Sequence, residues 1–298
     1  MKQILIDNAL ESWNSAILYA NDIMKGMATL KYRKNFVASL HNATELFIKQ
    51  LMLDIGDHSV CKKFSARKDP DSALLTKYKA ATDLNLFFSS LSSVDLEICH
   101  SEDYNVIIRK TETLFNTYYA EHPQDQAVVS DALRVLRDLR NNETHFFIDK
   151  WTFLTETEFT QLYNFMIVFY RILQEYSLLP FWGEPLEEYK DFEFTKPTLT
   201  SFSYKDALLS SNVLRNIADI SDDVQLSSGD DSAFSVAKEI IECCSPRKWE
   251  GKFNELWAQV ETAMHYGLLT IDEVIEEYDE PEIGKGEKVY WYINVQYQ

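Results

Sequence analysis

The sequence predicts a mainly α-helical protein, in which an N-terminal helical bundle over residues 1–182 precedes a smaller, acidic α+β domain over residues 183–298. Three observations predict this organisation. Apolar residues recur at intervals of three and four through the first 180 residues, as on one face of an α-helix. Prolines and a glycine interrupt that pattern between Pro180 and Pro197. Beyond them, two short stretches alternate between apolar and polar residues, as strands do.

The helices of the expected bundle follow from this periodicity and from start and stop signals. The second helix ends at Gly56, and the last begins at Thr155 with a Thr-x-x-Glu capping signature and ends before Pro180. Residues 57–79 are mostly polar and are expected to connect two helices. The expected helices cover residues 8–27, 33–55, 83–91, 104–119, 125–145 and 155–179.

The C-terminal domain is expected to combine short strands with helices. Alternating side chains favour strands over residues 192–204 and 289–297. Helical periodicity favours helices over residues 204–218, 232–244, 253–266 and 271–278.

The negative charge of the protein is concentrated in this C-terminal domain. The chain has a formal net charge of -18; residues 1–180 contain 19 basic and 23 acidic residues, whereas residues 181–298 contain 10 and 24. Since the first part is close to neutral, it can still present a local basic surface. Carboxylates repel phosphate, so the acidic part favours a protein partner, such as an inhibitor or a trigger, over nucleic acid.

Long apolar segments and paired cysteine motifs are both missing from the sequence. The longest apolar stretch, residues 165–173, is too short to span a bilayer and contains Arg171, and the N-terminus lacks a signal-peptide pattern. The four cysteines and the histidines lack the spacing of metal ligands. We therefore expect a cytoplasmic protein with no membrane contact, no metal and no other cofactor.

Residues 140–145 read Arg-Asn-Asn-Glu-Thr-His, near the end of the helix expected at residues 125–145. Arg140 can bind a phosphate through its planar guanidinium, and His145 titrates near neutral pH, so it can accept or donate a proton. On an α-helix Asn141 lies about 40° from His145, whereas Arg140 lies about 140° from it. Arg140 and His145 therefore share one site only if the helix ends between them or a second chain completes the site.

An arginine and a histidine together suit metal-independent cleavage of RNA. The 2′-hydroxyl must lose a proton, the phosphate gains negative charge in the transition state, and the leaving 5′-oxygen must gain a proton. The spacing alone favours a structural explanation, in which Arg140 is an exposed ion-pairing residue and His145 is a partly buried capping residue.

The motif resembles the R-x(4–6)-H signature of the HEPN superfamily, in which Asn, His or Asp typically follows the arginine. Here the arginine is Arg140, the next residue is Asn141, and the histidine is His145. The family's early helix often carries Glu-x-x-x-Lys among apolar residues, and this chain has Glu45 and Lys49 in such a setting. The resemblance covers about residues 8–180.

The resemblance implies a HEPN-like bundle that dimerises so that two such motifs face each other in one cleft. It also implies a metal-independent endoribonuclease of an abortive-infection, toxin–antitoxin or other antiphage system. Glu45 would then help to order the site, for instance by holding Arg140; its alternative role is an ion pair with Lys49, four residues further along the helix.

Other basic residues extend this hypothesis. Arg137 precedes Arg140 by one turn and could widen a cationic surface, although neighbouring acidic residues could neutralise it. The densest basic cluster could contact RNA phosphates or form a solvated loop. It consists of Lys62, Lys63, Arg67 and Lys68.

Two other classes of function remain open. A HEPN-like binding or sensor module would use the motif for dimerisation and partner binding without catalysis. An antitoxin or inhibitor would use the acidic C-terminal part to bind a basic partner.

Overall fold

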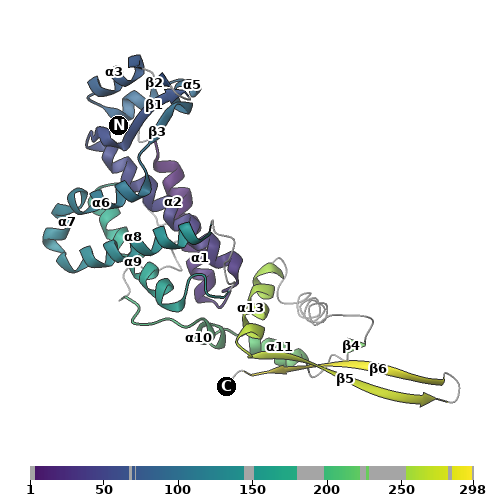
Figure 1. Cartoon of the computed structure of the whole chain (residues 1–298). Helices are drawn as coiled ribbons and strands as arrows, with labels where there is room; N and C mark the ends of the chain where they lie inside the picture. Colours follow the sequence, from purple (N-terminus) through teal and green to yellow (C-terminus); the bar gives the residue numbers. More distant parts are fainter. Residues whose placement is uncertain are drawn as a thin grey trace. The chain divides into compact units, whose positions relative to one another are not determined.

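The computed structural model of the chain is mostly helical, with small sheets (Figure 1). The chain folds into two compact units. Unit 1 comprises residues 1–20 and 34–201, and unit 2 comprises residues 21–33 and 202–298. The expected boundary after residue 182 stays a prediction, since it falls outside the described part. The described residues are 4–66, 69–70, 72–143, 151–179, 198–221, 226–227, 253–280 and 284–296.

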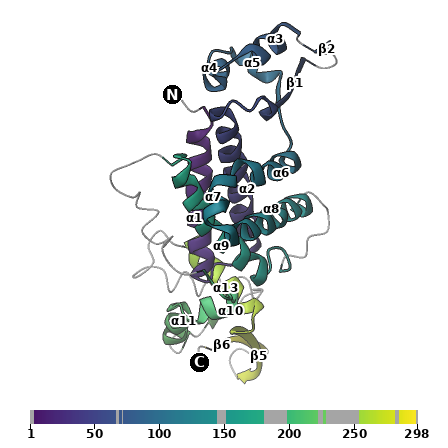
Figure 2. The same ribbon diagram turned by 90° about the vertical axis from the view of Figure 1, so that its left-hand side faces the viewer.

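The bundle of unit 1 is built on long helices predicted from the sequence. Helices α1 and α2 lie side by side in both views (Figure 1; Figure 2). Aromatic side chains join them to α9: Trp13 of α1 lies 6.4 Å from Phe47 of α2 and 6.0 Å from Phe169 of α9, measured between ring centroids. All three side chains are buried. The helices are α1 (Ile6–Met24), α2 (Leu30–Asp54), α8 (Pro123–Glu143) and α9 (Glu156–Glu175).

Helix α9 begins where the capping signature predicts. The side chain of Thr155 accepts a hydrogen bond from the backbone N–H of Glu158, and the Glu158 carboxylate accepts one from the backbone N–H of Thr155. Buried residues cover most of the circumference of the helix between Phe159 and Leu173, which places it in the core. α8 packs against it.

The polar segment over residues 57–79, for which the sequence predicted no helix or strand, contains both. Strand β1 pairs with both β2 and β3 in antiparallel orientation. Phe64 of β1 is buried and its ring centroid lies 4.9 Å from that of Tyr78 in α3, which gives this small sheet an apolar core. The elements are η1 (His58–Val60), β1 (Cys61–Ala66), β2 (Asp69–Pro70), α3 (Ser72–Ala80), α4 (Leu84–Ser89), α5 (Ser93–Glu97) and β3 (Cys99–Ser101).

Two shorter helices, α6 (Tyr104–Leu114) and α7 (Asn116–Glu121), lead from this sheet to α8. The sequence predicted one helix over residues 104–119. The structure divides it at Phe115, which is 1% exposed and whose ring centroid lies 6.4 Å from that of Phe169. This contact places Phe115 in the same aromatic core as Trp13 and Phe47.

Unit 2 combines helices with a long antiparallel hairpin. Its core contains Leu208, Leu214, Leu256 and Val260, all at most 2% exposed. The prediction of a helix over residues 253–266 is confirmed, and the expected strand over residues 289–297 lies largely within β6. The elements are α10 (Tyr204–Leu209), α11 (Val213–Ser221), β4 (Leu226–Ser227), α13 (Phe253–His265), β5 (Leu269–Glu280) and β6 (Gly284–Val295).

The turn between α1 and α2 belongs to unit 2. Gly26 has a positive φ of +89°, and a Cβ atom there would lie 3.0 Å from the Cα of Leu208, so a side chain would strain this turn. The backbone N–H of Ala28 donates to the hydroxyl of Thr262 at 3.3 Å. The side chain of Gln259 donates to the carbonyl of Lys25 at 2.7 Å.

Two predictions for the C-terminal part are wrong. Residues 271–278 form part of β5, not a helix, because β5 pairs with β6 from Leu269 to Glu280. Residues 198–203 form no strand. There the backbone N–H and carbonyl of Leu199 bind the side chain of Asn164 in α9, at 2.7 and 2.9 Å, instead of a neighbouring strand. Residues 192–197 and the helix expected at 232–244 lie outside the described residues.

None of the described helices combines the length and the apolar character needed to cross a bilayer.

Candidate functional site

The C-terminal turn of α8 carries the first part of the candidate site. The helix buries an apolar face that includes Leu133, Leu136 and Leu139, as its periodicity predicts. In the following turn Arg140 and Asn141 are exposed. The helix is described as far as Glu143, and His145 lies outside the described residues. The fold therefore presents the guanidinium and the amide of the motif at the protein surface.

Two further arginines precede Arg140 at intervals of three. Residues three apart on an α-helix lie about 60° from each other, so the three arginines form one stripe along α8. The guanidinium of Arg134 donates to Asp131 at 3.0 Å, and that of Arg137 donates to Asp138 at 2.9 Å. The neighbouring acidic residues thus do neutralise part of this stripe.

A ladder of polar side chains, four residues apart, runs along α2. Lys49 forms an ion pair with Glu45 and donates a hydrogen bond to the hydroxyl of Ser101 in β3 at 2.8 Å. Nδ1 of His41 lies 3.9 Å from the Glu45 carboxylate. The structural role foreseen for Glu45, an ion pair with Lys49, is present. That Glu45 also helps to order Arg140 stays a prediction.

Tyr104, the first residue of α6, connects this ladder to α8. Its ring stacks on that of His41, with centroids 4.0 Å apart and planes 31° apart. Its hydroxyl is buried and has no hydrogen-bond partner in the described part of the chain. Burial raises the pKa of Tyr104; the charge of Glu45 raises it further, and that of Arg137 opposes the shift. His41, Glu45, Tyr104 and Arg137 are here called the polar cluster.

Sequence reasoning missed two members of the polar cluster. His41 had been considered only as a metal ligand, and Tyr104 only as part of a helix. The one local signal was the spacing of four between His41 and Glu45, which places both on the same face of a helix. Tyr104 had no such signal, because its contact with α2 depends on the packing of α6.

The basic cluster is only partly described. Lys62, in β1, forms an ion pair with Asp103 at 2.7 Å, and this hydrogen bond raises the pKa of Lys62. Lys63 is exposed. Arg67 and Lys68 lie outside the described residues. Because Asp103 offsets the charge of Lys62, the described part of this cluster attracts phosphate less than the sequence suggests.

Within the residues that the structure covers, no three His, Cys, Asp or Glu side chains are grouped as ligands of a metal ion. No protein-family model, curated protein or solved structure matches this chain. Chemically, the described part of the site offers an exposed guanidinium and amide that can bind a phosphodiester from solvent. One turn earlier on α8, Arg137 belongs to the polar cluster, which joins α2, α6 and α8.

Proposed function

We propose that this protein is a metal-independent endoribonuclease of the HEPN type. The observation that carries the proposal is the exposure of Arg140 and Asn141 on the last described turn of α8, which is otherwise anchored in the bundle. An arginine that binds RNA phosphate must reach solvent while its backbone is held in place. α8 meets both requirements, since it packs against α9 through its apolar face.

The proposed reaction needs only groups of this chain. The 2′-oxygen attacks the adjacent phosphorus, the bond from phosphorus to the 5′-oxygen breaks, and a 2′,3′-cyclic phosphate and a 5′-hydroxyl end result. His145 moves a proton in this exchange, Arg140 stabilises the negative charge on the phosphoryl oxygens, and Asn141 orients the substrate. A homodimer would bring two copies of the motif into one cleft.

The proposed setting is the cytoplasm, in antiphage defence or a toxin–antitoxin system. The RNA would be cellular or viral. The acidic C-terminal part would bind a protein inhibitor or trigger, since its charge disfavours RNA.

One observation favours the second candidate, a non-catalytic HEPN-like module that acts through dimerisation and partner binding. Glu45 and Lys49 already satisfy each other, so the early-helix motif has a structural explanation without catalysis. Arg137 likewise has Asp138 as a partner.

The decisive experiment incubates the purified full chain with a mixture of RNAs in EDTA and identifies the ends of the products. We expect 2′,3′-cyclic phosphate ends, and a loss of at least about 100-fold in rate for Arg140→Ala and for His145→Ala. Arg134→Ala is the matched control, because Arg134 lies on the same helix in an exposed ion pair with Asp131.

Thermal melting and light scattering of each variant separate the two candidates. Cleavage by the Arg134→Ala protein but not by folded Arg140→Ala and His145→Ala proteins supports the nuclease. Cleavage that all three variants retain is due to a contaminant and contradicts it. If no RNA is cut and His145→Ala dissociates a dimer, the binding module is the correct function.

A further inference from the structure

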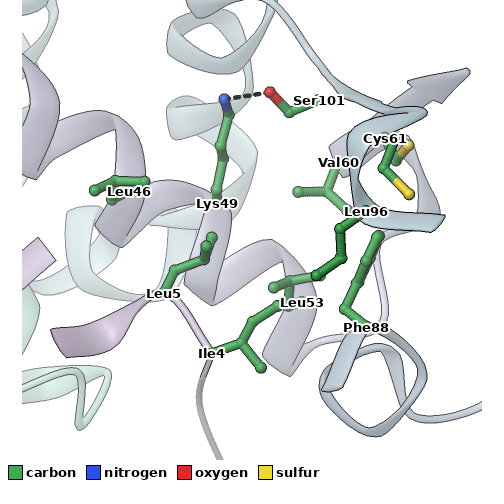
Figure 3. Close-up of a pocket in the computed structure, with 11 residues that line it drawn as sticks. Ile4, Leu5, Leu46, Lys49, Leu53, Val60, Cys61, Phe88, Leu96 and Ser101 are labelled. Carbon is green, nitrogen blue, oxygen red and sulfur yellow. Dashed lines mark hydrogen bonds between the residues drawn. The ribbon is translucent and has the colours of Figure 1, made fainter. Parts of the chain in front are cut away.

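Unit 1 contains a cavity of about 250 Å³ beside the N-terminal residues (Figure 3). Its walls come from α2, from the small sheet, from α4 and α5, and from Ile4 and Leu5. Most of the lining is apolar, with Leu53 of α2, Val60 and Phe88 among the contributors. The cavity is separate from the exposed turn of α8, so a ligand here would occupy a different site from the RNA proposed above.

One end of this cavity is polar. In Figure 3 the Lys49 ammonium and the Ser101 hydroxyl meet at one end of the lining, whereas Ile4 and Phe88 lie at the other. The Lys49 side chain is only 8% exposed. Two of its three N–H donors bind Glu45 and Ser101, and no other acceptor contacts it among the described residues. A buried ammonium with a remaining donor favours an oxygen acceptor in the adjacent space.

The charge of the pair decides which kind of oxygen fits. Lys49 and Glu45 together are neutral, so a ligand carboxylate would add a buried negative charge without a counter-ion. A neutral carbonyl or hydroxyl oxygen accepts the remaining hydrogen bond without that cost. The polar end therefore favours a neutral oxygen acceptor over an anion.

The two cysteines in the wall behave as apolar groups. Burial raises the pKa of the Cys61 thiol, and it raises that of the Cys99 thiol to about 12. Both thiols are therefore protonated at neutral pH, and they are poor nucleophiles and poor metal ligands in this form. The part of the wall that the two cysteines form is therefore suited to hydrocarbon.

The volume sets the size of the ligand. A molecule in liquid water, which has one non-hydrogen atom, occupies roughly 30 Å³. At that volume for each non-hydrogen atom, the cavity holds about eight such atoms. Leu96 lines the cavity and is 44% exposed, so it forms part of a rim through which a ligand can enter.

From these observations we infer that the cavity is a binding site for a small neutral amphiphile. Its hydrocarbon body has about six to eight carbons, the number that the cavity volume accommodates, and it carries one terminal carbonyl or hydroxyl oxygen. The oxygen accepts a hydrogen bond from Lys49, and the hydrocarbon lies against Leu53, Val60 and Phe88. The inference uses no residue of α8, and Lys49 is the one residue that it shares with the HEPN-like motifs.

The test titrates the full chain with three probes of nearly equal length: 2-heptanone, heptane and heptanoate. Binding is followed by the chemical shifts of residues around the cavity. We expect 2-heptanone to bind with a Kd of about 1 mM or below, and each of the other probes to bind at least about five-fold more weakly. Leu53→Trp fills the cavity and should weaken 2-heptanone binding by at least about ten-fold.

Leu86→Trp is the matched control, because Leu86 is 66% exposed and does not line the cavity. Should the Leu53→Trp protein not fold, Leu46→Trp makes the same test at a half-buried lining position of α2. The inference is overturned if 2-heptanone does not bind at a concentration of about ten times the expected Kd, or if the cavity-filling variant and the control bind it with equal affinity. If heptanoate or heptane binds more tightly than 2-heptanone, the ligand is not a neutral amphiphile.

Discussion

The two ends of α8 carry opposite charges in opposite environments. At the N-terminal end the Asp125 side chain is 6% exposed. Its carboxylate accepts a hydrogen bond from the Tyr118 hydroxyl at 2.7 Å and lies 3.3 Å from the guanidinium of Arg171. These contacts join α7, α8 and α9. At the C-terminal end Arg140 and Asn141 are exposed.

Both ends are favourable for the helix, because an acidic group near the N-terminus and a basic group near the C-terminus complement its dipole. The difference between them is burial. A buried polar group is held by its partners, and removing one partner leaves the other unsatisfied. An exposed group at the other end costs little to remove and remains accessible to a ligand. We therefore expect the first end to govern stability and the second to govern function.

The largest effect on stability is expected for Asp125→Ala. The substitution leaves the Tyr118 hydroxyl without its acceptor, removes the partner of Arg171 and removes an acidic group from the first turn of α8. We expect the free energy of unfolding to fall by about 2 to 3 kcal/mol, as measured by urea denaturation.

Asp131→Ala is the control on the same helix, since its carboxylate is exposed and pairs with exposed Arg134. It should change the free energy of unfolding by less than about 0.5 kcal/mol. If both Asp125→Ala and Asp131→Ala lowered the free energy of unfolding by the same amount, burial would not explain the stabilising role of Asp125.

An intermediate effect is expected at Asp57, which follows α2 and is neither fully buried nor fully exposed. It accepts hydrogen bonds from the backbone N–H of Ser59 and from the ammonium of Lys110, both at 2.9 Å. Burial alone would raise the pKa of Asp57, but the hydrogen bonds from Ser59 and Lys110 outweigh it, so the pKa is lowered. Asp57→Asn should lower the free energy of unfolding by about 1 kcal/mol at pH 7.

The pH dependence follows from the direction of this shift. Because the pKa of Asp57 is lower in the folded state, its stabilisation is complete above the unfolded value of about 3.9 and is lost as the pH falls through the folded value. Urea denaturation at pH 7 and at successively lower pH should therefore show the wild type and Asp57→Asn converging in acid. If the difference in the free energy of unfolding between the wild type and Asp57→Asn stayed constant below about pH 3, the ionisation of Asp57 would not be its source.

The helices of the bundle could be predicted because their signals are local. The apolar face of α8 and the capping box at Thr155 can be read directly from neighbouring residues, and the structure contains both. The error at β5 has the opposite origin. Apolar residues at Ile271, Val274, Ile275 and Tyr278 follow the spacing of a helix face, but pairing with β6, the next strand along the chain, outweighs this spacing and makes the segment a strand.

The candidate site divides in the same way. The position of Arg140 and Asn141 near the end of a helix followed from the sequence, and their exposure leaves the expected chemistry possible. The contact of Tyr104 with His41 could not be predicted, since it joins α6 to α2 through tertiary packing. The ion pair of Lys49 with Glu45 was foreseen from its spacing, whereas the hydrogen bond of Lys49 to Ser101 in β3 was not.

The smallest effect on stability is expected for Arg140→Ala, at the exposed end of α8. The variant loses a favourable charge near the helix C-terminus, worth a few tenths of a kcal/mol, and little buried surface. Urea denaturation should therefore place its free energy of unfolding within about 0.5 kcal/mol of the wild type. A loss in the free energy of unfolding as large as that of Asp125→Ala would mean that Arg140 anchors the bundle, and would contradict the division of α8 into a structural and a functional end.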